Sequence, residues 1–422
     1  MVPDTPSTGT RTVSRRRALA ALGAGALAAT AGCAGLRDAV GPLRRHVHRS
    51  DADLSGDAGP WPTRGADARR SGTVAGRAPP EDAVVSRVTT VDRYVRTQPA
   101  IVGGRAYVGA DRRTTATDET QFSGLVAVDL DAERPEGRTA WRAAAGGPTT
   151  SFTPTVAGHT VVAPLGEGVK ALDRRDGTVR WRTTAGGGTT AVVGGTCYTY
   201  ADRVVALDAV TGERRWQSEE TAAAPTGFAV VKDAVALACG DGGDGSLYCF
   251  DRTDGATRWR YAALGESYAS AVVDDDRAYA VSTAGVLHAV TLDGGERAWT
   301  HAFDGESYRR VAVADGVVYA AGTNDDAVVA LDAATGERRW RYDAGIGGAS
   351  TPAVTPDSVL VVAPTSEGRR LLVLDRASGA ERYRFALPAG LFEEVQPVVR
   401  DGVAYVPAEP RRETQGYLYA VH

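Results

Sequence analysis

The chain has 422 residues, a net charge of −4, 43% hydrophobic residues and 24% charged residues. This composition can bury a core, which excludes a wholly disordered chain, and its acidic balance argues against nucleic acid, whose phosphates attract a basic face. Fifty glycines and twenty prolines without a Gly-X-Y period exclude collagen and favour many short strands joined by tight turns. We therefore predict an all-β fold.

The N-terminus has the pattern of an export signal. Arg15, Arg16 and Arg17 precede an uncharged run of small and apolar residues, 18–32, that ends at Cys33. This run is shorter than the roughly 20 residues that span a bilayer, and the arginine cluster is typical of a twin-arginine signal. We predict that residues 1–32 form a signal peptide, the alternative being a buried Ala-rich helix.

Residues 33–60 have the composition of a tether. Thr30-Ala31-Gly32-Cys33 resembles a lipobox with Thr in place of the usual Leu, so we expect Cys33 to carry a lipid. The next stretch is basic and includes His46 and His48, which are too few to specify a metal site; it either contacts anionic head groups or is a solvated linker. A Gly/Asp/Ser-rich linker follows from residue 50. These features predict an exported protein anchored to the outer face of the cytoplasmic membrane.

The remainder of the chain contains eight repeats with a mean spacing of about 42 residues. Four clear copies are ALDRRDGTVRW, ALDAVTGERRW, CFDRTDGATRW and ALDAATGERRW, which end at Trp181, Trp216, Trp259 and Trp340. Diverged copies end at Trp141, Trp299 and Tyr383, and the last copy stops at His422. An apolar unit with a Gly/Asp turn, such as PAIVGGRAYVGA or PVVRDGVAYVPA, precedes every copy.

Each repeat predicts four antiparallel strands, which is one propeller blade. We therefore expect residues 61–422 to form a monomeric eight-bladed β-propeller. The Thr-Gly turn supplies a left-handed position, and the preceding Asp can accept backbone N–H bonds across it. We expect six tryptophans to dock flat between neighbouring blades: Trp141, Trp181, Trp216, Trp259, Trp299 and Trp340.

The last repeat lacks its Trp strand because the chain ends at His422. An open edge strand is unfavourable, so a strand from elsewhere should complete this blade. Residues 84–91, VVSRVTTV, precede the first inner strand and fit that place. We predict that the ring closes by pairing N- and C-terminal segments.

These motifs resemble the pyrroloquinoline-quinone-like (PQQ-like) propeller repeat family. Its signature, the tryptophan docking motif, runs from Ala-x-Asp through Thr-Gly to Trp, and residues 206–216 and 330–340 match it closely. Trp61, in GPWPTRGADARRSG, is similar to the segment that opens many family members. With its lipobox the chain resembles BamB-like exported lipoproteins, most of all their haloarchaeal relatives. Because an archaeon has no outer membrane, the fold alone does not imply a role in outer-membrane assembly.

The resemblance also implies an alternative, because the family's alcohol dehydrogenases bind PQQ with calcium above an adjacent Cys-Cys pair. Cys197, Cys239 and Cys249 are not adjacent, and no haem motif occurs. Cys239 and Cys249 either form a cross-strand disulfide or, as we favour, remain buried thiols. We expect no catalytic residue, metal or cofactor.

Two acidic groups have weak metal-site patterns. Asp241 and Asp244, in CGDGGDGS, are two carboxylates in a glycine-rich loop and favour a hairpin turn over a calcium site. Asp274, Asp275 and Asp276 have the pattern of a solvated turn.

The central channel supplies the candidate binding residues. The inner strands of a propeller begin around the axis, and alignment of the repeats places there Gln98, Thr153, Thr189, Phe228, Ser270, Arg310, Thr351 and Gln396. These positions either line a water-filled channel or bind a ligand. Arg310, beside Arg309, differs from the small polar residues, and a guanidinium can hold a carboxylate or other anion unless Glu393 and Glu394 neutralise it.

The sequence thus favours a non-enzymatic, membrane-anchored propeller that binds an unidentified protein or ligand through one face of the ring. The alternatives are a PQQ-dependent alcohol or sugar dehydrogenase and a BamB-like envelope assembly factor.

Overall fold

The structure, a computed structural model, describes residues 63–91, 98–110, 122–130, 138–146, 152–220, 225–240, 245–307, 309–323, 326–345, 347–388, 395–408 and 416–422. All of them belong to one unit that extends from His48 to His422. The predicted signal peptide, Cys33, the tether and Trp61 lie outside the described residues. The described part of the chain contains no helix long and apolar enough to cross a membrane.

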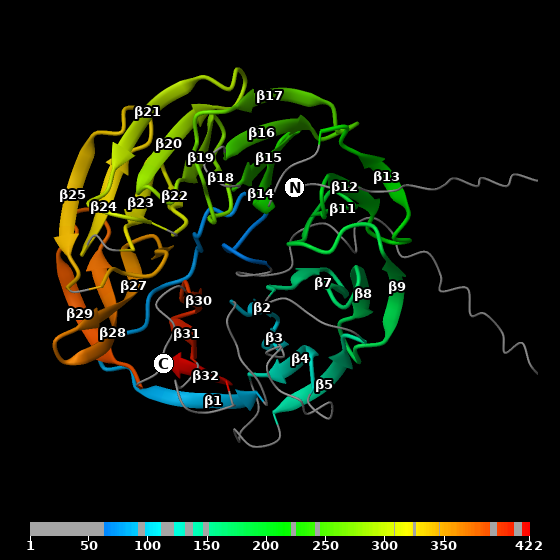
Figure 1. Cartoon of the computed structure of the whole chain (residues 1–422). Helices are drawn as coiled ribbons and strands as arrows, with labels where there is room; N and C mark the ends of the chain where they lie inside the picture. Colours follow the sequence, from blue (N-terminus) through cyan, green and yellow to red (C-terminus); the bar gives the residue numbers. More distant parts are fainter. Residues whose placement is uncertain are drawn as a thin grey trace, which may run out of the picture. The chain divides into compact units, whose positions relative to one another are not determined.

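Eight four-stranded antiparallel sheets are arranged as blades around an axis (Figure 1), which confirms the predicted eight-bladed propeller. Blades 1 to 4 consist of β2 (Ala100–Val102), β3 (Arg105–Ala110), β4 (Gly124–Asp129) and β5 (Thr139–Ala144); β6 (Thr155–Ala157), β7 (Thr160–Pro164), β8 (Val169–Asp173) and β9 (Val179–Thr183); β10 (Ala191–Val193), β11 (Thr196–Tyr200), β12 (Val204–Asp208) and β13 (Arg214–Gln217); and β14 (Pro225–Val231), β15 (Ala234–Cys239), β16 (Ser246–Asp251) and β17 (Thr257–Tyr261).

Blades 5 to 7 consist of β18 (Val272–Val273), β19 (Arg277–Val281), β20 (Val286–Thr291) and β21 (Arg297–Ala302); β22 (Ala312–Ala314), β23 (Val317–Ala321), β24 (Ala327–Asp332) and β25 (Arg338–Asp343); and β26 (Ala353–Val354), β27 (Ser358–Thr365), β28 (Gly368–Asp375) and β29 (Glu381–Ala386). Blade 8 contains β30 (Val398–Arg400), β31 (Val403–Ala408), β32 (Gly416–Val421) and β1 (Val85–Val91).

Blade 8 confirms the predicted closure of the ring. Strand β1 pairs antiparallel with β32, from Val85 opposite Val421 to Val91 opposite Gly416. The backbone N–H groups of Val84 and His422 each donate to the other residue's carbonyl oxygen, at 2.8 and 3.0 Å. The N-terminal strand therefore occupies the outer position that the last repeat leaves empty.

Burial follows the position of each strand in its blade. The second strand β23 and the third strand β24 are almost wholly buried, because both of their faces pack against neighbouring blades. The outer strand β25 alternates instead, with Trp340 buried among exposed neighbours. The core is therefore a series of layers between blades, in which Trp340 packs with Val361 and Leu372 of the next blade.

The outer-strand tryptophans have a recurring geometry. Each indole Nε1 donates, at 2.7–3.1 Å, to the carbonyl oxygen of the residue that follows the Asp column of the next blade, as Trp340 does to Arg376. Each ring also lies against the turn glycine of that blade, such as Gly379 beside Trp340. In blade 7 Tyr383 takes the Trp position, and its hydroxyl donates to the carbonyl oxygen of Pro79 at 2.6 Å.

Candidate functional site

The axis of the ring contains part of the chain itself. Residues 63–77, named here the axial segment, enter the ring before β1 begins (Figure 1). Thr63 Oγ1 contacts Thr155 Oγ1 at 2.9 Å in blade 2, and the backbone N–H of Gly65 donates to Gln98 Oε1 at 3.1 Å in blade 1. The segment thus begins between two blades that follow it in sequence.

Backbone hydrogen bonds then hold the axial segment along the inner strands. The carbonyl oxygens of residues 68, 69, 71 and 72 accept in turn from the N–H groups of Val230, Val273, Val313 and Val354, at 2.8–3.0 Å. Val74 N donates to the carbonyl oxygen of Val354, and Gly402 N donates to that of Arg77. The segment therefore crosses blades 4 to 8 in order.

Arg70 is the side chain that fixes this segment most firmly. It is fully buried, and Nε and Nη2 donate to the carbonyl oxygens of Phe228 and Thr190 at 3.1 and 3.0 Å. Nη1 donates to Thr63 Oγ1 and to the carbonyl oxygen of Arg64. Burial, and after it the charge of Arg64, lowers the pKa of Arg70 to about 9. One guanidinium thus joins the axial segment to blades 3 and 4.

The predicted ring of inner-strand residues lies beside this segment, and three of its members are hydrogen-bonded to one another. Seven of its eight members are buried, including Phe228, Arg310 and Gln396, and only Thr189 is half-buried. Gln98 Nε2 donates to Gln396 Oε1 at 2.9 Å, and Arg310 Nη2 donates to both glutamine Oε1 atoms at 3.1 Å. The backbone N–H of Gly65 in the axial segment donates to Gln98 Oε1 of this group at 3.1 Å.

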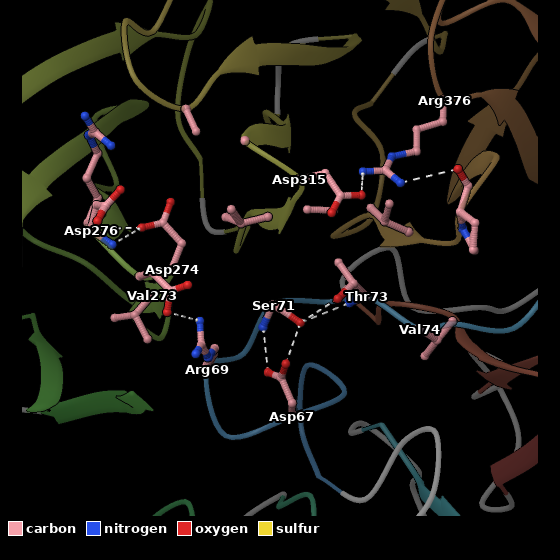
Figure 2. A pocket seen from close by; sticks show the side chains of 18 of the residues that line it. Asp67, Arg69, Ser71, Thr73, Val74, Val273, Asp274, Asp276, Asp315 and Arg376 are labelled. Atoms are coloured by element: carbon pink, nitrogen blue, oxygen red, sulfur yellow. Dashed lines mark hydrogen bonds and ion pairs between the residues drawn. The ribbon is translucent and has the colours of Figure 1, made fainter. Parts of the chain in front are cut away.

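A groove of about 920 Å³ lies between the axial segment and blades 5 to 7 (Figure 2). It lies on the face that carries the hairpins between first and second strands. Arg69 pairs with Asp275 at 2.8 Å and Arg376 with Asp315 at 2.7 Å, which makes the walls polar. Asp276, exposed in its turn, also lines the groove. Such walls suit a polar macromolecular surface better than a small apolar ligand.

The axial segment and its groove were not found by sequence reasoning, although the stretch ADARRSG was noticed as a family-like opening. The segment has no counterpart in the repeats, so periodicity cannot locate it. Its one signal is an arginine pair, Arg69 and Arg70, between small residues in an otherwise acidic chain.

The three described cysteines are buried free thiols, as favoured from the sequence. Cys239 lies opposite Ser246 and Cys249 opposite Ala236, and the two thiols belong to different core clusters, so no disulfide joins them. Burial raises the pKa of Cys197, Cys239 and Cys249 to about 12, which makes all three unreactive.

Of the acidic groups, Asp274 caps its own turn by accepting from the backbone N–H groups of Asp276 and Arg277. The pair Asp241 and Asp244, like Glu393 and Glu394, lies outside the described residues. Within the described ranges no three His, Cys, Asp or Glu side chains are grouped as metal ligands.

The described residues contain neither a group of three metal-ligating side chains nor an adjacent pair of thiols that could serve PQQ with calcium. The axial segment is hydrogen-bonded to the inner part of the ring from Thr63 to Gly72. The thiols that could form a floor lie in separate strands.

Comparisons with known proteins agree with this geometry. The family model described as outer membrane protein assembly factor BamB matches residues 70–218, 121–243, 243–361 and 324–418. No curated protein matches the sequence.

Among solved structures, BamB from Moraxella catarrhalis is similar with a TM-score of 0.58 and 20% identity, over 80% of this chain and 98% of that one. Quinohemoprotein alcohol dehydrogenase from Comamonas testosteroni is similar with a TM-score of 0.66 and 14% identity, over 88% of this chain and 83% of that one. A europium-containing methanol dehydrogenase is similar with a TM-score of 0.66 and 13% identity, over 87% of this chain and 99% of that one. At these identities the structures establish the shared fold alone. Because the family model covers most of the propeller, the chain belongs to the BamB family of PQQ-like β-propellers.

Proposed function

We propose that this chain is an exported, membrane-anchored propeller that binds another protein through one face of its ring and performs no redox chemistry. The observation that carries the proposal is the axial segment. It is hydrogen-bonded along the inner strands of the ring, and it forms one wall of the open groove on the face of blades 5 to 7.

The groove can be tested by a charge reversal. Asp276→Arg changes an exposed wall residue, whereas Asp202→Arg is a matched control in the exposed turn between β11 and β12, at the opposite end of the blades. The mature chain and both variants are purified from the native host, and co-purifying proteins are quantified. Loss of one partner with Asp276→Arg alone supports the proposal; equal recovery with all three proteins contradicts it.

Anchoring through a lipid on Cys33 is a separate part of the proposal, motivated by the arginine cluster and the Thr-Ala-Gly-Cys sequence. Replacement of Cys33 by Ser should move the protein from the membrane fraction to the soluble exported fraction. Undiminished membrane retention would count against a lipid anchor.

The alternative function, PQQ-dependent oxidation of an alcohol or sugar, is favoured only by fold similarity to dehydrogenases. Calorimetric titration with PQQ and calcium should show no binding in the micromolar range, because several charge-assisted contacts, each worth roughly 1.5–3 kcal/mol, are missing. Micromolar binding that disappears with Arg310→Ala would overturn the non-enzymatic proposal. A role in envelope assembly would instead appear as co-purification with a membrane-protein assembly complex.

A further inference from the structure

Two pockets of the same construction lie between neighbouring blades, each beside an outer-strand tryptophan. The blade 6–7 pocket lies beside Trp340 and has a volume of about 450 Å³, and the blade 3–4 pocket lies beside Trp216 and has a volume of about 380 Å³. Both are lined from equivalent positions of the repeat, which are the hairpin after the first strand, the second strand, the outer strand and two turns of the next blade. Small-molecule sites have volumes of roughly 300–1,000 Å³, so either pocket has room for a ligand group.

The blade 6–7 pocket contains a carboxylate of the chain itself. Asp315 is the first residue of the two-residue hairpin between β22 and β23, and its Oδ2 accepts from Arg376 Nη2 at 2.7 Å. Arg376 Nε donates to the hydroxyl of Tyr319 at 2.9 Å. A guanidinium held in this way pairs well with a carboxylate, and this pocket therefore shows which chemistry its architecture accepts.

The blade 3–4 pocket has the arginine but not the carboxylate. Gly194 takes the place of Asp315 in the hairpin between β10 and β11, and Arg252 takes the place of Arg376. A Cβ at Gly194 would lie 3.2 Å from Arg252 Nη2, so this guanidinium faces its hairpin as Arg376 faces Asp315. Arg252 Nη1 donates to the carbonyl oxygen of Lys232, and among the described residues no carboxylate pairs with Arg252.

The other charges of the blade 3–4 pocket do not compensate Arg252. Lys232, which takes the place of a proline in the other pocket, lies with Nζ 3.7 Å from Asp275 Oδ1, an oxygen that Arg69 also contacts at 2.8 Å. Asp233 lines the pocket but pairs with Arg258 at 2.7 Å. Relative to the blade 6–7 pocket, one negative charge is missing and one positive charge is added, so the blade 3–4 pocket attracts an anion.

Trp216 gives this pocket an apolar wall. The other five outer-strand tryptophans are only 8–9% exposed, whereas Trp216 is half-buried and lines the pocket. The ring of Tyr198 packs beside it, with 5.9 Å between the ring centroids. An aromatic surface beside an uncompensated guanidinium suits a ligand with an apolar part and a carboxylate.

We propose that the blade 3–4 pocket binds a carboxylate ligand, which Arg252 holds as Arg376 holds Asp315. The apolar part of the ligand lies against Trp216, and Lys232 adds a second positive charge. A free organic acid and an acidic side chain of a partner protein share this chemistry. The pocket shares no lining residue with the groove of blades 5 to 7, so this proposal does not rest on protein binding at that groove.

Ligand-observed NMR titration of the mature chain tests this proposal. The probes are benzoate and a capped acetyl-Ala-Glu-Ala-amide peptide, and their neutral counterparts are benzamide and acetyl-Ala-Gln-Ala-amide. An acid should bind saturably and about tenfold or more tightly than its neutral counterpart, because only the acid forms a charge-assisted bond with Arg252. Binding of benzoate identifies a site for a free organic acid, and binding of the peptide alone identifies a site for a partner's side chain. If neither acid binds, or if acid and amide bind equally, the proposal is overturned.

Three variants locate the binding. Gly194→Asp adds the missing carboxylate in a backbone conformation that Asp315 already has, with φ values of +53° and +47°, and should weaken binding about tenfold or more by pairing with Arg252. Arg252→Gln should weaken it to a similar extent. Arg214→Gln removes an exposed guanidinium of β13 that does not line the pocket, and it should leave the affinity unchanged. Equal affinity in Arg252→Gln and Arg214→Gln overturns the proposal.

A direct measurement covers the case in which these variants fail to fold. Crystals of the unsubstituted mature chain are soaked in the acid that binds, as para-bromobenzoate or as the peptide. They should show its carboxylate within hydrogen-bond distance of the Arg252 guanidinium, and none beside Arg376, where Asp315 already takes that place. Binding of the acid elsewhere, with the blade 3–4 pocket empty, overturns the proposal.

Discussion

Asp332 shows how one carboxylate organises a turn and a strand together. Its Oδ1 accepts from the backbone N–H groups of Ala334 and Thr335 at 2.9 and 3.0 Å, and its Oδ2 accepts from Arg339 Nη2 at 2.8 Å. The same pair, at 2.6–2.8 Å, occurs in five blades and joins the Asp column to the arginine before Trp, or before Tyr383 in blade 7. Blade 5 lacks both partners, since Thr291 replaces the Asp and Ala298 the Arg.

This pair makes stability depend on pH. The hydrogen bond from Arg339 has the largest effect on the pKa of Asp332, and the backbone hydrogen bonds of the turn come next. Together they lower this pKa to about 2, whereas an aspartate in an unfolded chain has a pKa of about 3.9. A carboxylate whose pKa is lower in the folded state stabilises the fold when the pH is above its unfolded pKa. This contribution is lost as the pH falls from about 4 to about 2. We expect Asp332→Asn to reduce the acid-induced drop in the unfolding temperature over this range. The same drop in Asp332→Asn and in the unsubstituted protein would contradict the assignment; Asp202→Asn, in an exposed turn, is the control.

Trp340 combines ring packing with one hydrogen bond, and two substitutions separate these contributions. Trp340→Ala should lower the free energy of unfolding by about 3–5 kcal/mol, because a large cavity opens between blades 6 and 7. Trp340→Phe keeps most of the ring but loses the bond to Arg376, so it should cost about 1–2 kcal/mol. Urea unfolding measures both; equal losses would show that the hydrogen bond, and not packing, dominates.

At the scale of the element, a β-bulge explains why these residues meet. In β24 and β25 Ala330 lies opposite Trp340 and Leu331 opposite Arg338, which leaves Arg339 as the extra residue. The same shift occurs in the other blades that have their own outer strand. A bulge redirects the side chain that it inserts, so Arg339 turns toward Asp332 while Trp340 continues to face the next blade.

Gly336, in the turn that follows Asp332, is required both for its backbone conformation and for the space around it. Gly336 has a φ of +75°, and a Cβ there would lie 2.7 Å from the ring of Trp299. Gly316 has a φ of +72° with no atom within 4 Å of its Cβ position, so it is a matched control. Gly316→Ala should cost about 1 kcal/mol from backbone strain, and Gly336→Ala clearly more, measured by urea unfolding. Equal costs would show that contact with Trp299 contributes nothing.

At the scale of the molecule, the axial segment joins blades that are distant in sequence. Arg70 alone connects residues 63 and 64 with the carbonyl oxygens of Thr190 and Phe228. These contacts add long-range constraints to a ring in which each blade otherwise packs mainly on its neighbours. The segment therefore acts as an internal brace.

Arg70→Met tests this brace, because methionine fills the space but donates no hydrogen bond. We expect a loss of about 2–4 kcal/mol in unfolding free energy and faster tryptic cleavage at Arg64 and Arg69, since the segment detaches more often. Arg77→Met, at an exposed position of the same segment, should leave the cleavage rate unchanged. Unchanged cleavage in Arg70→Met would show that backbone hydrogen bonds hold the segment without its side chain.

The sequence by itself determined the eight blades and their turns, because each blade repeats the same local pattern of strand spacing, turn glycine and tryptophan. It also determined the donor strand β1, because this strand completes the last copy of the pattern. It also brought Gln98, Arg310 and Gln396 to one place, since equivalent positions of equivalent strands converge on one axis. Only the tertiary structure decided what surrounds them. The axial segment belongs to no repeat, and its position depends on backbone hydrogen bonds to residues 162 to 325 positions away. Local pattern therefore could not show that this segment crosses the ring or that Arg310 is buried.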